Sequence, residues 1–259
     1  MFTEERHKKI LGMIRENERV EVLSLSELFQ VSQDTIRRDL RIMEKKGLIS
    51  RTHGGAILPN KAAAFASYTT RTMLHKKEKC EITRLAAAFI EDGDAILLDG
   101  STTVSGLVPF LFEFKNLTVI TNSINIAHDI MQTPGNMKLF VVGGLVHQPS
   151  SNAVSYDTIQ AIQKLYVDKA FIGACTLSPT KGIGTDLIEE APVKEAMIKA
   201  ARKVFFMADN SKFSEESLIT VAPVESNHII LTDSGFTPDM MHKFQPLLEK
   251  GLKIYAGKG

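Results

Sequence analysis

The sequence predicts an α/β protein built from two parts of different character, and three observations carry this prediction. Three short amphipathic segments followed by a glycine-rich hairpin occupy residues 1–58. Beyond residue 77, short apolar runs alternate with longer amphipathic stretches, the pattern of a sheet covered by helices. Residues 59–77 between them lack clear periodicity. We therefore expect a small domain at 1–58, a connection at 59–77 and a larger domain at 78–259.

The first part reads as three helices and two strands. Helices are expected at about residues 4–16 and 24–30, and a third starts after Ser32, a good N-cap residue. Residues 47–58 read as two strands around a glycine turn. The apolar residues expected to face inward are Ile10, Leu11, Met13, Ile14, Leu25, Leu28, Phe29, Ile36, Leu40 and Met43. Three helices followed by a hairpin form a winged helix-turn-helix.

The second part reads as a mostly parallel sheet with helices between its strands. The apolar runs that predict strands are rich in Val, Ile, Leu and Phe, and they lie at residues 95–98, 117–120, 139–142, 170–172, 204–207, 229–231 and 252–255. The longer stretches that predict helices include residues 78–90, 103–114 and 192–202. No repeat of fixed period is present.

Composition restricts the class of protein. Hydrophobic residues make up 44% of the 259 and charged residues 24%, which is ordinary for a soluble globular chain. There is no apolar run of 18 residues and no secretory leader at the N-terminus, so we expect a cytoplasmic protein without a membrane span. Cys80 and Cys175 are too few for a disulfide framework. The seven His residues are scattered without metal-ligand spacing, so no metal and no cofactor are expected.

Charge is concentrated in one short segment of an otherwise balanced chain. The formal net charge is +1, but residues 37–51 hold six Lys and Arg against two acidic residues. A confined basic segment is typical of a DNA-binding module. With Ile36 and Leu40 inward, the third helix exposes Gln33, Asp34, Thr35, Arg37, Arg38 and Arg41. Gln33 and Thr35 at the start of the helix are placed to read base edges, and an Arg can bind a guanine. Arg41, Lys45 and Arg51 are expected at phosphates. An amphipathic helix with solvated charges is the alternative.

Small polar clusters follow three successive strands of the predicted sheet. They are Asp99-Gly100-Ser101-Thr102-Thr103, Thr121-Asn122-Ser123 and Gly143-Gly144. Each cluster alone is compatible with a cap or a tight turn. Together, at one edge of a parallel sheet, they predict a ligand site, and the backbone N–H groups at helix starts favour a phosphate.

The N-terminal part resembles the DeoR family of bacterial operon repressors. The resemblance rests on Arg6 and Ile10, on Val31-Ser32-x-x-Thr35-Ile36-Arg37-Arg38-Asp39-Leu40, and on Gly47 and Arg51-x-His53-Gly54-Gly55-Ala56. It implies a recognition helix in the major groove of double-stranded operator DNA and a wing at the backbone or minor groove. Ser32 and His53 join the expected DNA contacts on this basis, although His53 also suits a role in the turn. Gly54 and Gly55 would let the wing turn tightly and approach DNA.

The C-terminal part resembles the sensor domain of the same family, and through it the sugar-phosphate folds of ribose-5-phosphate isomerase and glucosamine-6-phosphate deaminase. Besides the clusters above, the matching positions are Asp168-x-Ala170-Phe171-x-Gly173, Glu190-Ala191-x-x-Lys194 and Ala208-Asp209-Asn210-Ser211-Lys212-Phe213. The resemblance implies a phosphorylated sugar or polyol as effector, with Lys194, Asp209 and Lys212 as further contacts. Lys194 also reads as an exposed helix cation.

Two positions depart from the usual family pattern. Many members carry glycine at the third place of the first cluster, where this chain has Ser101 after Gly100. Many also carry an Arg after the glycine pair, where this chain has Leu145-Val146-His147-Gln148. The second departure opens the alternative of a polar but uncharged ligand face.

The leading interpretation is a ligand-responsive transcription factor, a repressor of a carbohydrate or polyol operon that acts as a homodimer or homotetramer. The alternative is a sugar-phosphate isomerase or deaminase with an attached DNA-binding module. Such chemistry needs a carboxylate base and an opposing electrophile. Asp99, Asp209 and Lys212 are nominal candidates, but no carboxylate cluster divides these roles. We therefore expect no catalytic residues.

Overall fold

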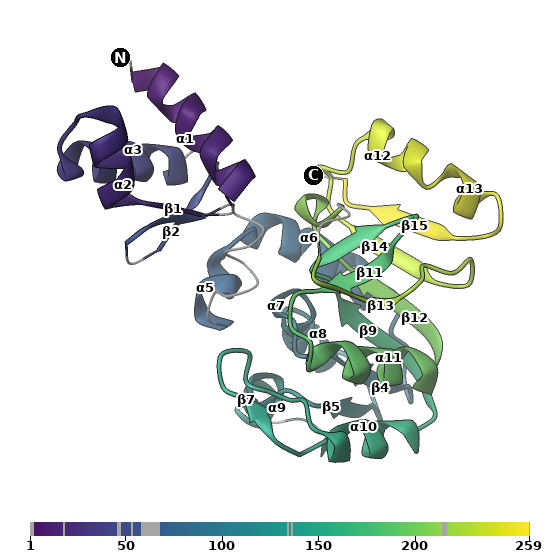
Figure 1. Ribbon diagram of the computed structural model, residues 1–259. Helices are drawn as coiled ribbons and strands as arrows, with labels where there is room; N and C mark the ends of the chain where they lie inside the picture. The colour runs from purple at the N-terminus through teal and green to yellow at the C-terminus, as the bar shows by residue number, and fades with distance from the viewer. Residues whose placement is uncertain are drawn as a thin grey trace. The chain divides into compact units, whose positions relative to one another are not determined.

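The structure is a computed structural model that describes residues 3–17, 19–45, 48–52, 54–57, 68–133, 135, 137–213 and 217–258. The chain divides into two compact units, residues 1–65 and 66–259 (Figure 1). Residues 58–67, which include much of the connection expected from the sequence, lie outside the described residues.

Three helices and a three-stranded antiparallel sheet form the N-terminal unit, which confirms the predicted winged helix-turn-helix. In chain order the elements are α1 (Thr3–Asn17), β1 (Arg19–Glu21), α2 (Val22–Phe29), α3 (Gln33–Lys45), β2 (Ser50–Arg51) and β3 (Gly55–Ile57). Strand β3 lies between β1 and β2. Strand β1 was not predicted, because three residues are too few to display a period of two.

One apolar cluster joins the three helices to the sheet. Its fully buried members include Ile10, Ile14, Leu25, Ile36, Leu40 and Met43, all expected inside. The inward position expected for Leu28 is wrong, since this side chain is 58% exposed. Helix α2 begins earlier than predicted, and its inward stripe runs through Val22, Leu25 and Phe29 at spacings of three and four, which turns Leu28 to the surface.

A seven-stranded parallel sheet forms the centre of the C-terminal unit, in the order β15-β14-β12-β9-β4-β5-β6. Its strands are β4 (Ala95–Leu98), β5 (Thr118–Thr121), β6 (Lys138–Val141), β9 (Val167–Gly173), β12 (Ala201–Met207), β14 (Ile229–Thr232) and β15 (Lys253–Ala256). Every one of the seven predicted strands is present, so the predicted α/β class is confirmed.

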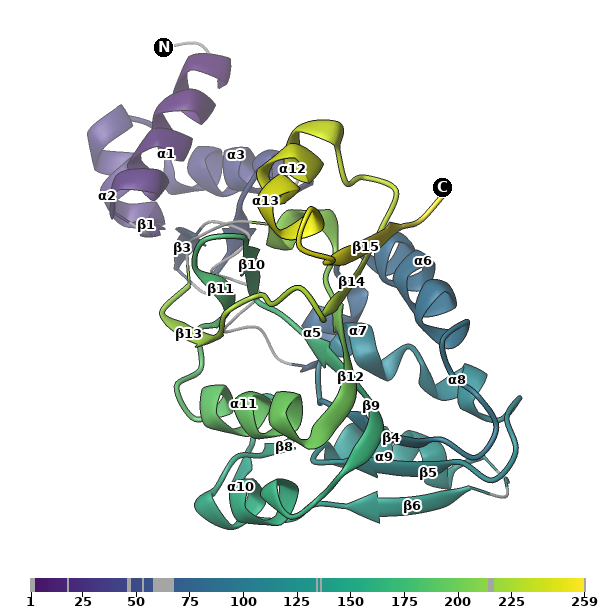
Figure 2. The same ribbon diagram turned by 90° about the vertical axis from the view of Figure 1, so that its right-hand side faces the viewer.

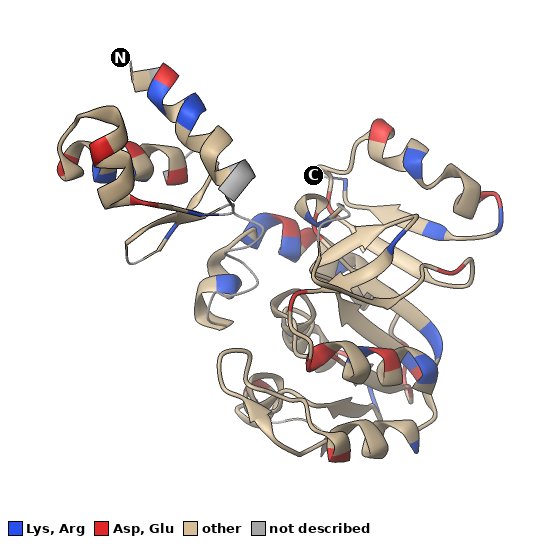
Figure 3. Ribbon diagram, in the orientation of Figure 1, with Lys and Arg blue, Asp and Glu red and all other residues tan. Residues whose placement is uncertain are grey.

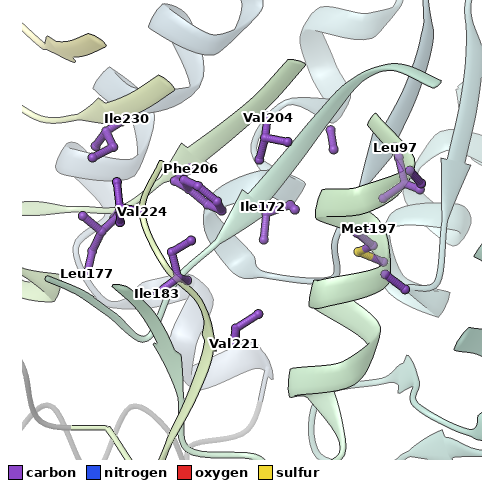
Figure 4. Close-up of a cluster of buried hydrophobic side chains, with 14 of the residues drawn as sticks. Leu97, Ile172, Leu177, Ile183, Met197, Val204, Phe206, Val221, Val224 and Ile230 are labelled. Atoms are coloured by element: carbon purple, nitrogen blue, oxygen red, sulfur yellow. The ribbon is translucent and has the colours of Figure 1, made fainter. Parts of the chain in front are cut away.

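Helices cover both faces of this sheet (Figure 2). One face carries α6 (Lys76–Ala87), α7 (Thr102–Ser105), α8 (Val108–Leu111) and α9 (Ile124–Met131). The other carries α10 (Tyr156–Gln163), α11 (Glu190–Ala200), α12 (Pro238–Lys243) and α13 (Gln245–Leu248). Side chains such as Phe206, Ile172 and Met197 fill the space between sheet and helices on the second face (Figure 4). No described helix is long and apolar enough to cross a membrane.

Several short elements of the second unit were not predicted. A separate antiparallel sheet is formed by β10 (Thr176–Ser178), β11 (Gly182–Thr185) and β13 (Ile219–Ala222), and a small hairpin by β7 (Val146–His147) and β8 (Asn152–Ala153). A short helix, α5 (Tyr68–Met73), and the 3-10 turn η1 (Asn210–Lys212) complete the unit. The single helix expected over residues 103–114 is wrong. It is divided into α7 and α8, with Pro109 in the first turn of α8, because proline lacks the N–H that a continuous helix needs.

The strand order of the large sheet reverses between β4 and β9. From β4 the chain proceeds through β5 to β6 on one side, and from β9 it proceeds through β12 and β14 to β15 on the other. In open α/β sheets, ligands bind beyond the carboxyl ends of the strands at such a switch point. Here those ends lead into the Asp99 loop after β4 and into Gly173 at the end of β9.

The two wing glycines have different roles, which leads to a first prediction. A Cβ on Gly55 would lie 1.7 Å from the backbone oxygen of Val20 in the neighbouring strand, whereas Gly54 has open space around it. Gly55→Ala should therefore destabilise the N-terminal unit by about 1–3 kcal/mol or more through overpacking, while Gly54→Ala should leave it nearly unchanged. Thermal unfolding of both variants measures this, and equal stability of the two would contradict the close approach of β1 and β3.

Candidate functional site

Helix α3 presents a polar face built on a buried one. Its start is capped by Ser32, whose Oγ accepts from the backbone N–H of Thr35 at 3.2 Å and lies 2.9 Å from the Thr35 hydroxyl. Ile36 and Leu40 are buried, as predicted. The predicted outer residues Gln33, Asp34, Arg37, Arg38 and Arg41 are exposed, as is Glu44, while Thr35 is half-buried. The helix therefore has the amphipathic form that major-groove reading requires.

A buried ion pair fixes α3 against α1. Asp39, only 2% exposed, accepts from Arg6 Nε at 2.6 Å and lies 3.1 Å from His7 Nε2. Removing one partner would leave an uncompensated charge in the interior, which is strongly destabilising. Asp39 is therefore paired in the interior of the unit, and its negative charge does not lie on the outer face of α3.

The exposed arginines of this unit differ in their partners. Arg37 pairs with Asp34 at 3.0 Å and donates to Gln33 Oε1 at 3.2 Å, and Arg51 pairs with Glu44 at 3.0 Å. Within the part of the chain that the structure describes, Arg38 and Arg41 have no such pair and point to the exposed face. His53 and the side chain of Lys45 lie outside the described residues.

At the switch point of the large sheet, Lys194 from α11 binds the ends of two strands. Its Nζ donates to Asp99 Oδ2 and, at 2.9 Å, to the Gly173 carbonyl. Lys194 and Asp99 are 6% and 2% exposed, so Lys194 is not the exposed helix cation that one reading allowed. Burial opposes its charge, but the carboxylates of Asp99 and Glu190 more than offset this and hold the pKa of Lys194 above its ordinary value.

The loop after β4 is shaped by two glycines. Ser101 Oγ caps α7 by accepting from Val104 N–H at 3.2 Å, and a Cβ on Gly173 would lie 2.2 Å from that oxygen. Gly173 therefore makes the room that Ser101 needs in place of the usual glycine. A Cβ on Gly100 would lie 1.7 Å from Asn152 Oδ1, so Gly100 lets the Asn152 amide lie against the backbone.

Lys79 from α6 contacts this loop, and the charges of two further cations act on Lys79. Lys79 Nζ donates to Thr102 Oγ1 at 3.0 Å and to the Arg71 carbonyl at 2.5 Å. Burial lowers the pKa of Lys79 to about 8; Asp209 raises it, while Lys212 and Arg71 lower it further. Asp209, Lys212 and Arg71 thus lie close enough to Lys79 to affect its charge. Figure 3 shows the basic residues of α5 and α6 in blue.

Sequence reasoning found only part of this cluster. It named Thr102, Asp209 and Lys212 but neither Lys79 nor Arg71. These two follow no strand of the sheet, and only the packing of α5 and α6 against α7 brings them near the loop. Arg71 Nε is buried and has no hydrogen-bond partner within the described part of the chain. Asp209 is 1% exposed and binds the N–H and hydroxyl of Ser211.

The residues of the second cluster are buried and mostly engaged within the unit. Thr121 Oγ1 donates to the Leu98 carbonyl at 2.8 Å and accepts from Ser123 N–H at 3.1 Å. Ser123 Oγ caps α9, accepting from Ile126 N–H at 3.5 Å. Asn122 Nδ2 donates to the Ala153 carbonyl at 2.8 Å, which leaves its carbonyl oxygen as the free polar atom of the cluster.

A small depression lies between these loops and α11. Its lining residues are Asp99, Gly100, Asn122, Asn152, Glu190, Val193, Lys194 and Met197. Asn152 was not singled out in the sequence, and Glu190 was matched to the family pattern without being expected as a contact. A hydrogen bond of 3.2 Å joins the two side chains. Thr103 is buried, while Gly143 and Gly144 are exposed and pack near Ser155 and Thr158 at the start of α10 rather than lining this depression.

A winged helix with an exposed arginine face, joined to an α/β unit with polar loops at its switch point, defines a transcriptional regulator with a sensor domain. Residues 6–62 match the family model of the DeoR-like helix-turn-helix domain, and residues 74–234 match that of the DeoR C terminal sensor domain. The chain belongs to the DeoR family of transcriptional regulators.

Named relatives are similar along nearly their whole length. The HTH-type transcriptional repressor GlcR of Bacillus subtilis is 36% identical over 233 residues, which cover 90% of this chain and 89% of that protein. The transcriptional repressor AccR of Agrobacterium fabrum is 32% identical over 90% of each chain.

Among solved structures, ribose-5-phosphate isomerase A of Methanocaldococcus jannaschii is similar over 53% of this chain and 54% of its own, at 16% identity and with a TM-score of 0.39.

The buried pair at the switch point leads to a second prediction. Lys194→Met would leave the Asp99 carboxylate buried without its partner, so the C-terminal unit should lose about 3–5 kcal/mol of stability. Lys199→Met on the same helix removes an exposed pair with Glu195 and should cost less than about 1 kcal/mol. Urea unfolding of both variants measures the difference. Similar losses would mean that the Lys194–Asp99 contact contributes no more than a surface pair.

Proposed function

We propose that this regulator is a repressor of a carbohydrate or polyol operon and that a phosphorylated sugar or polyol controls it. The observation that carries the proposal is the hydrogen bond of Lys79 to Thr102 in the loop after β4, with Arg71 and Lys212 close enough to Lys79 to lower its pKa. Cations beside a loop rich in hydroxyl and N–H donors favour a phosphate group. The names of GlcR and AccR as repressors support the direction of control.

In this proposal the two units divide the work. Residues 1–58 bind operator DNA, residues 59–77 connect, and residues 78–259 sense the effector and hold the chain in a homodimer or homotetramer in the cytoplasm. Pairing of two winged helices supplies the specificity that one half-site lacks, and light scattering of the full chain measures the assembly. Ser32 and Thr35 set the start of the recognition helix. Gln33 and Arg38 read bases, and Arg41 binds phosphate.

The alternative function, sugar-phosphate isomerisation or deamination, has less support. Proton abstraction next to a carbonyl needs a carboxylate free to accept a proton. Asp99 is held by Lys194, and Asp209 is held by Ser211. Both nominal bases are therefore occupied by internal contacts, and we propose a sensor without turnover.

The DNA interface is tested by comparing two arginines of α3. Arg38→Ala should weaken binding to a site selected by the protein from random DNA by about 1–3 kcal/mol and relax the preference at one base pair. Arg41→Ala should weaken binding to selected and unrelated DNA alike and reduce the salt dependence by about one phosphate contact. Fluorescence anisotropy at several salt concentrations separates the two. An Arg38→Ala variant that loses affinity equally for both DNAs would assign Arg38 to phosphate contact.

The effector site is tested through the charge of Lys79. Because the pKa of Lys79 is lowered to about 8, protonated Lys79 is present below that pH and is lost as pH rises through it. Affinity for the phosphate ester that stabilises the protein most should therefore fall about tenfold between pH 7 and 9. Lys79→Arg keeps its charge in this range and should remove the fall, whereas Lys79→Met should bind weakly throughout.

Calorimetry measures the ester affinity, and ester-induced release of DNA by fluorescence anisotropy measures the response. Wild type and Lys79→Arg showing the same pH dependence would contradict a role for Lys79 at the anion. Absence of any ester response while DNA binding is intact would contradict a phosphorylated effector.

A further inference from the structure

Two buried amide oxygens of residues that line the depression have no hydrogen-bond partner among the residues that the structure describes. They are Asn122 Oδ1 and Asn152 Oδ1, from residues that are each 4% exposed. Buried polar atoms are nearly always paired, and each exception calls for an explanation, a missing water or ligand among them. Both residues line the same depression beside Asp99 and Lys194.

The hydrogen bonds that the two amide nitrogens donate set the orientation of both side chains. Asn122 Nδ2 donates to the Ala153 carbonyl at 2.8 Å, and Asn152 Nδ2 donates to Glu190 Oε1 at 3.2 Å. Carbonyl and carboxylate oxygens accept hydrogen bonds only, so the nitrogen of each amide must face them. The two free atoms are therefore acceptors, and what they lack is a donor.

Charged side chains around the depression restrict which donor fits. Asp99 and Glu190 disfavour an anion, so a phosphate is excluded from this end. Lys194 disfavours a cation, and only two of its three N–H donors have partners among the described residues, at Asp99 and the Gly173 carbonyl. A neutral group that both donates to an amide oxygen and accepts from an ammonium group meets these conditions, and a hydroxyl group does both.

We propose that this depression is a hydroxyl subsite, in which Asn122 and Asn152 accept from hydroxyl groups of the effector and Lys194 donates to them. The inference rests on the proposed function, since it places the sugar or polyol part of the ligand next to the cationic end that takes its phosphate. It makes Asn122 and Asn152 specificity-determining residues. It also accounts for Gly100, because a Cβ there would occupy the position of Asn152 Oδ1.

The test uses pairs of phosphate esters that differ by one hydroxyl. The pairs are ribose 5-phosphate with 2-deoxyribose 5-phosphate, glucose 6-phosphate with 2-deoxyglucose 6-phosphate, and glycerol 3-phosphate with 3-hydroxypropyl phosphate. Inorganic phosphate serves as the probe of the anion end alone. Calorimetry on the full chain compares wild type with Asn122→Ala and Asn152→Ala, and with Asn227→Ala, an exposed asparagine outside the depression.

Wild type and Asn227→Ala should prefer the hydroxylated member of at least one pair about tenfold. Asn122→Ala and Asn152→Ala should reduce that preference to about twofold or less while binding inorganic phosphate as wild type does. Gly100→Ala, which displaces the Asn152 amide without deleting it, should have the same effect and serves if an Asn variant does not fold.

Two outcomes would overturn the hydroxyl subsite while leaving the proposed function in place. One is ester binding by wild type with equal affinity within every pair. The other is an undiminished preference in both Asn variants and in Gly100→Ala. If no ester and no phosphate bound to wild type, the phosphorylated effector would fail and the subsite with it.

Discussion

At the point where the strand order of the large sheet reverses, one ammonium group joins three segments that lie far apart in the sequence. Lys194 reaches from α11 to the Asp99 carboxylate after β4 and to the Gly173 carbonyl at the end of β9. A buried pair of this kind contributes little net stability compared with apolar packing, but it is strongly destabilising when half of it is removed. The main effect of this pair is to fix the positions of the ends of β4 and β9, and the remaining loops of the site are arranged around these two ends.

The loops around this pair pack closely against one another because two glycines leave space for neighbouring side chains. Gly173 leaves room for Ser101, and Gly100 leaves room for Asn152. Ser101 departs from the family pattern, and Gly173 at the end of β9 leaves the space that its side chain needs. Charge divides the site in the same way. Lys79 of α6, which the charges of Arg71 and Lys212 affect, contacts one end, and two amides, the Lys194–Asp99 pair and Glu190 line the other.

The sequence predicts those features whose residues are neighbours in the chain, and it misses those that form only when distant segments pack together. The inner strands of the parallel sheet were predictable because both of their faces are covered, so they read as apolar runs. The edge strands β6 and β15 also carry enough apolar residues to be predicted, although much of each is exposed. Strand β1 was missed because it has only three residues. The antiparallel strands β10, β11 and β13 were missed because polar residues and glycines interrupt them, so none reads as an apolar run. Asp99, Gly100 and Asn122 were found because they follow strands. Asn152, Glu190, Lys79 and Arg71 come from a hairpin and from helices, and only tertiary packing brings them near those strand ends.

Lys79 connects the proposed anion end to the segment that follows the inter-domain connection. Its Nζ donates to the Arg71 carbonyl on α5 and the Thr102 hydroxyl on α7, and with a pKa of about 8 its charge is lost as the pH rises above neutral. An anion at the proposed site would hold Lys79 protonated, and charge-assisted hydrogen bonds are stronger than neutral ones. The same anion would therefore tighten both bonds and with them the attachment of α5, which begins at Tyr68. Binding free energies are reciprocal, so any state of the protein in which α5 is held less tightly must bind the anion less well. A sensor needs this coupling, because through it the binding of the ligand changes the conformation of another segment.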